Sequence, residues 1–215
     1  MDLTGPRLVP AEGGPARSAV LLLHGYGADG NDLIGLAAEW ASALPETLFF
    51  SPNAPFACEA NPFGRQWFGF ENKRLDLVAV EVATAAQVID RAIDALLAEL
   101  SITPGQIALA GFSQGTMMAL HVGLRRSKQV AGILGYSGLL MAPELLDRQL
   151  RSKPPVLLIH GDSDTVVPSQ SLGEAEAALK GLGVPVEALL RPGLAHGIDP
   201  HGLAVGGKFL ERVLP

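Results

Sequence analysis

Six short apolar stretches run through the 215-residue chain, and each holds consecutive apolar residues instead of an alternation of apolar and polar ones. They cover residues 19–24, 47–51, 106–110, 130–136, 156–160 and 186–191. A strand that is apolar on both faces is typical of a parallel sheet that helices cover on both sides. This pattern therefore predicts an α/β fold with a doubly wound, mostly parallel sheet flanked by helices.

Stretches with helical character alternate with these strands. We expect helices at residues 31–44, 83–100, 114–126, 143–150 and 169–182. Asn31 is a candidate cap for the first helix, and Asp199 followed by Pro200 marks the start of a last one. No repeat or linker interrupts the alternation, so we expect a single domain over residues 1–215 with no large lid domain.

Composition limits the class of protein and its partners. Hydrophobic residues make up 48% of the chain and charged residues 18%, which excludes a disordered protein. The formal net charge of −6 argues against binding to nucleic acid or anionic lipid. The apolar stretches are too short for stable membrane insertion, and the N-terminal residues lack a signal-peptide pattern. With a single cysteine, Cys58, these features predict a soluble cytoplasmic protein.

The pentapeptide Gly111-Phe112-Ser113-Gln114-Gly115 matches the pattern G-x-S-x-G. An apolar strand leads directly into it and a helix-forming stretch follows, which is the setting of a nucleophile elbow. A serine in so tight a turn has strained backbone angles, and glycines two residues before and after it avoid clashes with the neighbouring strand and helix. Ser113 is therefore the candidate nucleophile.

A serine nucleophile needs a base, and the base needs an orienting acid, which in this fold follow the serine in the order acid and then histidine. The strand at 156–160 leads into a loop with two candidate acids, Asp162 and Asp164. Asp162 directly follows the strand, where a side chain often caps the turn, whereas Asp164 extends farther and is favoured. His196 lies between glycines after the last strand and is the candidate base.

The other four histidines have simpler interpretations. His24 and His160 each end a strand before a glycine, so we expect them to hydrogen-bond to loop backbone. His121 falls on the helix after Ser113, where it is expected to be packed or partly exposed. His201 belongs to the first turn of the last helix and is expected to be solvated.

The loop His24-Gly25-Tyr26-Gly27 follows the first strong strand. In this fold that loop supplies one N–H group of the oxyanion hole, and its glycines let the backbone approach the substrate. We assign this role to the Tyr26 amide. The Gln114 amide, at the N-terminus of the helix after Ser113, supplies the second donor.

Metal and nucleotide sites are not expected. No pair of histidine, cysteine or carboxylate residues has zinc-ligand spacing, and no phosphate-binding glycine loop occurs. Cys58 lies in a proline-rich stretch without a neighbouring base, so we do not expect it to be a nucleophile. The sequence predicts chemistry that requires no cofactor.

Five ordered motifs together resemble the phospholipase/carboxylesterase family, which includes small bacterial carboxylesterases and acyl-protein thioesterases. They begin at Leu23, Ser51, Gly111, His160 and His196 and read LHGYGADGNDL, SPNAP, GFSQG, HGDSDTVVP and HGIDP. The resemblance runs from about residue 18 to the C-terminus.

The resemblance implies an α/β-hydrolase fold in which Ser113, Asp164 and His196 form the triad, and it selects Asp164 over Asp162. It implies that the segment with Trp67 and Phe68 lies beside the acyl pocket, which makes both candidate substrate-binding residues. The apolar residues here, Trp67, Phe68 and Phe70, suit an aliphatic acyl chain. Gly69 follows where many members have an acidic residue, and Tyr26 stands where leucine is common. The partner it implies is a small-molecule ester, and a homodimer is compatible with it.

These observations predict a serine carboxylesterase that hydrolyses short- to medium-chain esters through an acyl-enzyme. Two alternatives stay open at this point. One is an acyl-protein thioesterase or lysophospholipase that acts on longer acyl chains. The other is a catalytically silent binding protein with the same fold, although such proteins usually lose a triad member.

Overall fold

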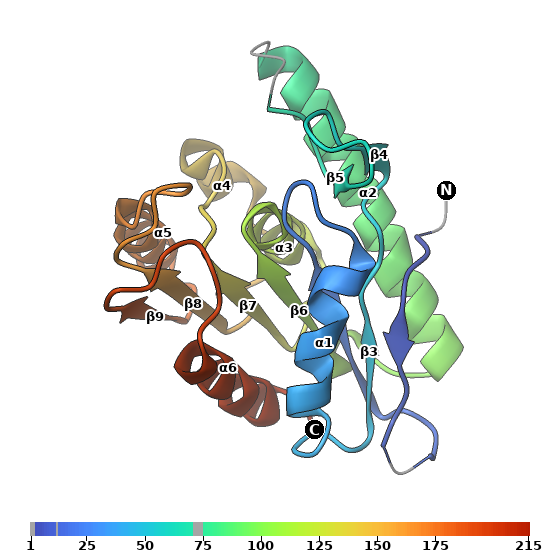
Figure 1. Ribbon diagram of the computed structural model, residues 1–215. Helices are drawn as coiled ribbons and strands as arrows, with labels where there is room; N and C mark the ends of the chain where they lie inside the picture. The colour runs from blue at the N-terminus through green and yellow to red at the C-terminus, as the bar shows by residue number, and fades with distance from the viewer. Residues whose placement is uncertain (1–2, 12, 71–74) are drawn as a thin grey trace.

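The computed structural model describes residues 3–11, 13–70 and 75–215. Within them, a seven-stranded sheet has the order β1-β3-β2-β6-β7-β8-β9, and every neighbouring pair is parallel except β1 with β3 (Figure 1). The strands are β1 Arg7–Leu8, β2 Ser18–Leu23, β3 Thr47–Phe50, β6 Ile107–Phe112, β7 Gly132–Tyr136, β8 Val156–Gly161 and β9 Val186–Arg191. The predicted mostly parallel sheet is confirmed.

The six predicted strands all occur, with ends that differ by no more than two residues. Strands β2, β3, β7 and β8 are buried along their whole length, as their unbroken apolar sequences predict. Strand β9 is an edge strand and is only partly buried. Two features without a sequence signal are the two-residue β1 and a small hairpin of β4 Phe56–Ala57 and β5 Arg65–Gln66, because pairs this short show no periodicity.

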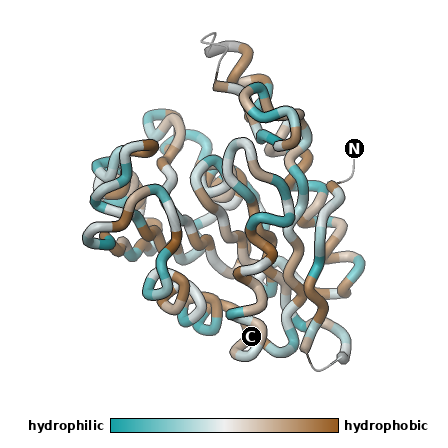
Figure 2. Tube along the Cα trace, in the orientation of Figure 1, coloured by the Kyte–Doolittle hydropathy of each residue, from teal (hydrophilic) through white to brown (hydrophobic). Residues whose placement is uncertain are grey.

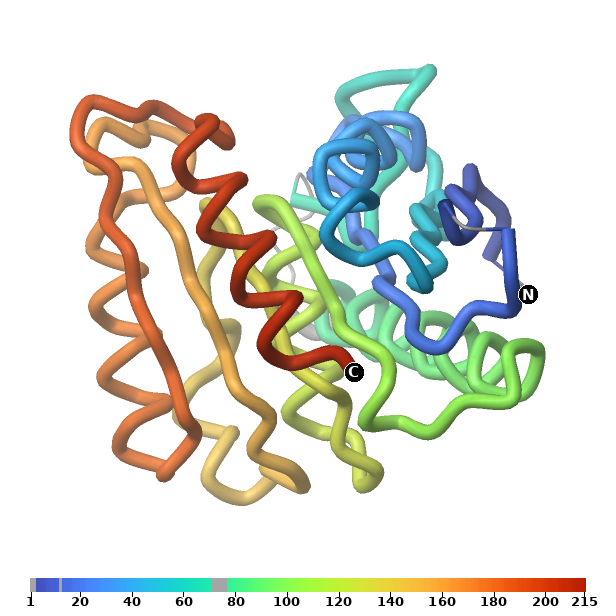
Figure 3. Tube along the Cα trace, turned by 90° about the horizontal axis from the view of Figure 1, so that it is seen from below, coloured from blue at the N-terminus to red at the C-terminus, as the bar shows by residue number. Residues whose placement is uncertain are grey.

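Two layers of helices cover the sheet. Helices α1 Gly30–Trp40 and α6 Pro200–Val213 pack on one face, and α2 Leu75–Leu100, α3 Gln114–Arg125 and α5 Gln170–Gly181 pack on the other, together with the short α4 Pro143–Gln149 (Figure 3). A 3₁₀ turn at Pro104–Gln106 leads into β6. The buried hydrophobic residues form two clusters, one between the sheet and α2, α3 and α5 and the other between the sheet and α1 and α6. Hydrophobic colour along the central strands is visible in Figure 2.

Helix α2 begins eight residues before the predicted start at residue 83. The reason lies in its first turns, where apolar residues occupy all sides and hide the helical period. Val82 is buried, whereas Val80 is 62% exposed. The N-terminal part of α2 therefore extends past the sheet, as Figure 1 shows.

The start of α1 corrects one prediction. The cap is Asp29, whose carboxylate accepts a hydrogen bond from the Asn31 amide at 2.8 Å. Asn31 itself lies in the first turn of the helix. Aspartate and asparagine are about equally good caps, so sequence alone did not separate the two residues.

Asp199 holds α6 in place, as predicted for its N-terminal cap. Its carboxylate accepts a hydrogen bond from the Gly202 amide at 2.7 Å. The guanidinium of Arg191, at the end of β9, donates to the same carboxylate at 2.8 and 3.0 Å. These hydrogen bonds lower the pKa of Asp199, and those from Arg191 have the largest effect. One side chain thus joins the last strand to the last helix.

No helix in the described ranges is long and apolar enough to cross a membrane.

We predict that Asp199→Ala destabilises the protein by about 1–2 kcal/mol, because it removes both the cap and the ion pair. Asp199→Asn keeps a capping oxygen and is expected to lose less. The pKa of Asp199 is lowered in the folded state, so its ionised carboxylate contributes fully to the free energy of unfolding at neutral pH. This contribution is lost as the pH falls through the lowered pKa. Urea unfolding at pH 7 and at pH 3 measures both effects, and an Asp199→Ala difference that does not shrink at pH 3 contradicts this account.

Candidate active site

The loops after four parallel strands meet at one edge of the sheet. Tyr26 follows β2, Ser113 follows β6, Asp164 follows β8 and His196 follows β9. Parallel strands end at the same edge, so residues far apart in the sequence come together there. Tyr26, Ser113 and His196 line one cavity, and Asp164 contacts His196 from behind.

Ser113 occupies the sharp turn between β6 and α3. Its φ of 53° and ψ of −116° place it in a region that non-glycine residues rarely occupy. The turn is held by a 2.8 Å hydrogen bond from the Ser113 amide to the Tyr136 carbonyl on β7. The flanking glycines are required by close contacts. A Cβ on Gly111 would lie 2.4 Å from the Gly115 carbonyl carbon, and one on Gly115 would lie 1.8 Å from the Leu23 carbonyl oxygen.

Asp164 and His196 are joined by a hydrogen bond of 2.7 Å between Oδ2 and Nδ1. The other carboxylate oxygen accepts hydrogen bonds from the amides of Val166 and Val167 at 2.8 and 2.9 Å. Burial by itself raises the pKa of Asp164, but these hydrogen bonds, with His196 the strongest, outweigh it and lower the pKa. The carboxylate is therefore ionised at neutral pH, and Nδ1 of His196 carries a proton toward it.

His160 adds a contact that the sequence did not indicate. As predicted, its Nε2 hydrogen-bonds to loop backbone, at the Val167 carbonyl 2.9 Å away. The same nitrogen lies 3.2 Å from Oδ2 of Asp164. Since the ring is almost completely buried at the end of β8, it fixes the loop that carries the acid.

Ser113 and His196 both face the cavity, and the His196 ring packs on Phe112 with the ring centroids 4.9 Å apart. Among the described residues, Ser113 Oγ forms no hydrogen bond. Such contacts are often long in substrate-free enzymes and shorten in the substrate complex. The Nε2 atom of His196 is not used by Asp164 and is free to accept a proton.

Two backbone N–H groups border the serine. Gln114 is the first residue of α3, so its amide has no partner within the helix. The Tyr26 amide has no backbone partner among the described residues either. The Gln114 side chain is used for support, because it accepts from the Trp67 amide at 2.8 Å and donates to the Phe68 carbonyl at 2.7 Å.

The Tyr26 side chain forms part of the cavity wall. Its ring packs against Phe70 with centroids 5.1 Å apart, and its hydroxyl approaches Glu59 at 3.5 Å. Burial, followed by the neighbouring Cys58 and Glu59, raises the pKa of Tyr26 to about 12. The phenol therefore stays protonated at neutral pH and gives the wall a polar edge.

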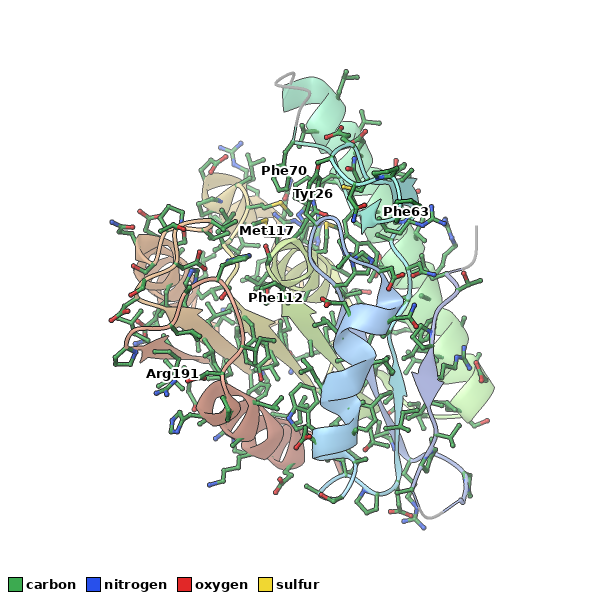
Figure 4. The ribbon with its side chains drawn as sticks, in the orientation of Figure 1. Tyr26, Phe63, Phe70, Phe112, Met117 and Arg191 are labelled. Carbon is green, nitrogen blue, oxygen red and sulfur yellow. The ribbon has the colours of Figure 1, made fainter. Side chains whose placement is uncertain are left out.

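The cavity has a volume of about 470 Å³ and is lined mainly by apolar side chains. Figure 4 shows Phe70 and Tyr26 above the start of α3, with Phe112 and Met117 below them. Leu139 and the segment 166–168 complete the apolar wall. Sequence reasoning had not assigned Phe112, Met117, Leu139 or residues 166–168 to this wall, because they come from separate strands, helices and loops.

Trp67 and Phe68 lie beside the cavity, as expected, but neither is among the residues that line it. Trp67 is fully buried and donates from its indole N–H to the His24 carbonyl at 2.9 Å. Phe68 is 3% exposed and packs against Phe70. The aromatic residue of this segment that lines the cavity is Phe70, which is 52% exposed.

His24 and Asp162, which the sequence analysis placed outside the site, form hydrogen bonds to nearby backbone groups. The two ring nitrogens of His24 contact the Gly25 carbonyl at 2.7 Å and the Ala54 amide at 3.0 Å. One nitrogen donates and the other accepts, so His24 is neutral, in line with the pKa that burial lowers. Asp162 accepts from the Gly193 amide at 2.7 Å and thus caps its turn.

The remaining candidates do not line the cavity that contains Ser113 and His196. His121 is partly buried on α3, and His201 is exposed. Cys58 is buried with no disulfide partner. Among the described residues no group of three or more histidine, cysteine or carboxylate side chains is arranged to hold a metal ion.

We predict that Gly115→Ala lowers both stability and ester hydrolysis strongly, because the added Cβ has no space beside the Leu23 carbonyl. Gly173 in α5 is the matched control, since nothing lies within 4 Å of its Cβ position. Gly173→Ala is expected to stabilise the protein by roughly 0.5–1 kcal/mol. Thermal unfolding compares the two, and equal stability of both variants contradicts the predicted clash.

We predict different effects at Phe70 and Trp67. Phe70→Ala is expected to raise KM for longer esters, because it removes apolar wall, with little change in stability. Trp67→Phe removes the indole hydrogen bond to His24 and is expected to cost about 1 kcal/mol of stability. Steady-state kinetics and urea unfolding of both variants test this division. It is wrong if Trp67→Phe changes KM without a loss of stability.

Comparison with known proteins agrees with this geometry. A family model described as Phospholipase/Carboxylesterase matches residues 6–214. The crystal structure of esterase PE8 has a TM-score of 0.94 and 42% sequence identity, and the match covers 100% of each chain. The predicted α/β-hydrolase fold is thereby confirmed.

Two similar proteins have names that indicate thioester substrates. Acyl-protein thioesterase 1 of Schizosaccharomyces pombe is 31% identical over 210 residues, which cover 92% of this chain and 91% of that protein. Acyl-protein thioesterase 1 of Gibberella zeae is 28% identical over 214 residues, with the same shares covered. The chain therefore belongs to the phospholipase/carboxylesterase family of hydrolases, which act on ester bonds.

Proposed function

We propose that the protein is a serine carboxylesterase that hydrolyses short- to medium-chain esters through an acyl-enzyme on Ser113. The observation that carries this proposal is the 2.7 Å contact between Asp164 and His196 at a cavity that also contains the strained Ser113 turn. A buried carboxylate, an oriented imidazole and a serine at an elbow are the elements of acyl transfer.

In the first step, Ser113 Oγ attacks the ester carbonyl carbon while Nε2 of His196 takes the hydroxyl proton. Asp164 holds the other ring nitrogen and stabilises the positive charge that forms on the imidazole. The carbonyl oxygen becomes negatively charged and accepts hydrogen bonds from the Tyr26 and Gln114 amides. The C–O bond to the alcohol then breaks, and the alcohol leaves with the proton from His196.

In the second step, water hydrolyses the acyl-enzyme. Nε2 of His196 takes a proton from the water as it attacks the acyl carbon, and the same two amides stabilise the oxyanion. The bond to Ser113 breaks, and the serine regains its proton from His196. The carboxylic acid is released, and no further group is needed to balance the reaction.

The shape of the cavity favours small esters. Its volume of about 470 Å³ lies near the lower end of the range for ligand sites, and Tyr26 and Phe70 narrow it from above. The apolar lining suits an aliphatic acyl group. Two relatives are named acyl-protein thioesterase, which favours one alternative: an enzyme that removes longer acyl chains from protein thiols or lysophospholipids.

A silent binding protein is the other alternative. Proteins of that kind usually lose a triad member, whereas Ser113, Asp164 and His196 are all present here. The backbone strain at Ser113 also favours an enzyme, because strained conformations persist where function requires them.

We predict that Ser113→Ala abolishes hydrolysis of p-nitrophenyl acetate and that Asp164→Asn lowers kcat by about 10⁴-fold through the wrong tautomer of His196. Asp162→Asn is the matched control, since Asp162 only caps its turn, and it is expected to retain most activity. Activity of the Ser113→Ala variant equal to that of the wild type rejects the mechanism. A series of p-nitrophenyl esters, a palmitoyl-peptide and a lysophospholipid then separate the esterase from its alternatives.

A further inference from the structure

A second apolar groove lies behind the active-site cavity. Helices α2 and α4 and the segment 139–142 form its walls, and α3 forms its floor. Figure 1 shows α3 between α2 and α4. The groove has a volume of about 650 Å³, larger than the active-site cavity, and the two are separated by Leu139, which lines both. The mechanism above uses none of the groove beyond Leu139.

The groove is apolar along most of its length. Val78 and Ala83 of α2 face Met141 and Leu145 across it, and Leu145 is 46% exposed. Polar side chains gather at one end, where His121, Arg125 and Gln149 form the lining. Burial lowers the pKa of His121 to about 4, so its ring is neutral at neutral pH.

Arg125 is the charged residue at that end, and it has no carboxylate partner among the described residues. Its Nε donates to Gln149 at 2.8 Å and its Nη1 to the His121 carbonyl at 3.2 Å, both of which are neutral. The next residue, Arg126, gives the contrast, because its guanidinium pairs with Asp90 and Asp94 at 2.6 and 2.7 Å.

The charge of Arg125 is also partly removed from water. Burial is the cause that lowers its pKa, although the guanidinium stays protonated at any physiological pH. A half-buried cation without a counter-ion gains free energy when an anion binds beside it. Glu81 of α2 does not serve this purpose, because its carboxylate accepts the Gly69 amide at 2.6 Å.

We propose that this groove binds an aliphatic carboxylate of medium length, with the carboxylate on Arg125 and the chain along α2 toward Leu139. An apolar groove with one unpaired guanidinium at its end is complementary to a fatty-acid anion. From Arg125 to Met117, which lies at the active-site side, α3 rises about 12 Å, and this sets the scale of the bound chain. The site is separate from the triad and does not depend on the proposed hydrolysis.

Calorimetric titration of the full chain with octanoate, decanoate and dodecanoate, kept below micelle formation, tests the proposal. We expect one molecule to bind in the groove, with about fourfold tighter binding for each added methylene until the groove is filled. Arg125→Gln is expected to weaken dodecanoate binding at least tenfold and to leave binding of neutral dodecanol unchanged. Arg148→Gln makes the same change of charge at an exposed position of α4 and should have no effect.

Two filling variants separate this groove from the active-site cavity. Ala83→Phe fills the groove from an exposed position on α2, and Val166→Phe narrows the active-site cavity. Loss of dodecanoate binding in Ala83→Phe with retention in Val166→Phe supports the proposal. The reverse result places the fatty acid in the active site and overturns it.

Other results also overturn the proposal. Equal binding of dodecanoate to Arg125→Gln and the wild type shows that the guanidinium does not recognise an anion. A third result would be that the wild type binds no dodecanoate and sediments as a dimer that Ala83→Phe dissociates. The groove would then be an interface between two copies of the chain. Hydrolysis of p-nitrophenyl acetate is measured separately, so failure here leaves the proposed function intact.

Discussion

The close contact between the start of α3 and the end of β2 supports the rest of the site. Gly115 lies against the Leu23 and His24 carbonyl groups, where even a methyl group has no space. This approach bends the chain sharply at Ser113 and brings the loop after β2 beside the serine. The proposed nucleophile and the two amides proposed for the oxyanion hole therefore share one packing contact. Strain at Ser113 is maintained because the surrounding sheet and helix allow no relaxed alternative.

Hydrogen bonds from the neighbouring loops complete this arrangement at the same edge of the sheet. Asp164 receives hydrogen bonds from His196 and from two backbone amides, and His160 approaches the same carboxylate. The Gln114 side chain ties the Trp67 segment to α3, so that segment supports the wall of the cavity from behind. Most polar groups near the site thus position their neighbours. The polar groups that remain for the proposed substrate are the Tyr26 and Gln114 amides and the side chains of Ser113 and His196.

The two hollows of the molecule differ in their chemistry. The active-site cavity is narrowed by aromatic rings and contains a histidine with a free nitrogen. The groove under α2 has at one end a guanidinium that forms no ion pair with any residue the structure describes. The groove is apolar where α2 extends past the sheet, whereas the apolar lining of the active-site cavity comes from loops, Phe112 and Met117 and includes no residue of α2. The apolar first turns of α2, which gave no clear periodicity in the sequence, form one wall of the groove.

The sequence by itself determined the parallel sheet and the sharp turn at Ser113, and it was sufficient to propose Asp164 and His196 as acid and base. Each of these depends on a local pattern: unbroken apolar strands, paired glycines and loops that follow strands. Tertiary structure decided which side chains face the cavity. Trp67 and Phe70 lie three residues apart in one segment, yet one is buried and the other lines the wall. The contact of His160 with Asp164 likewise depends on how separate elements pack, as does the lack of a carboxylate partner for Arg125 among the described residues. Periodicity along the chain does not predict either feature.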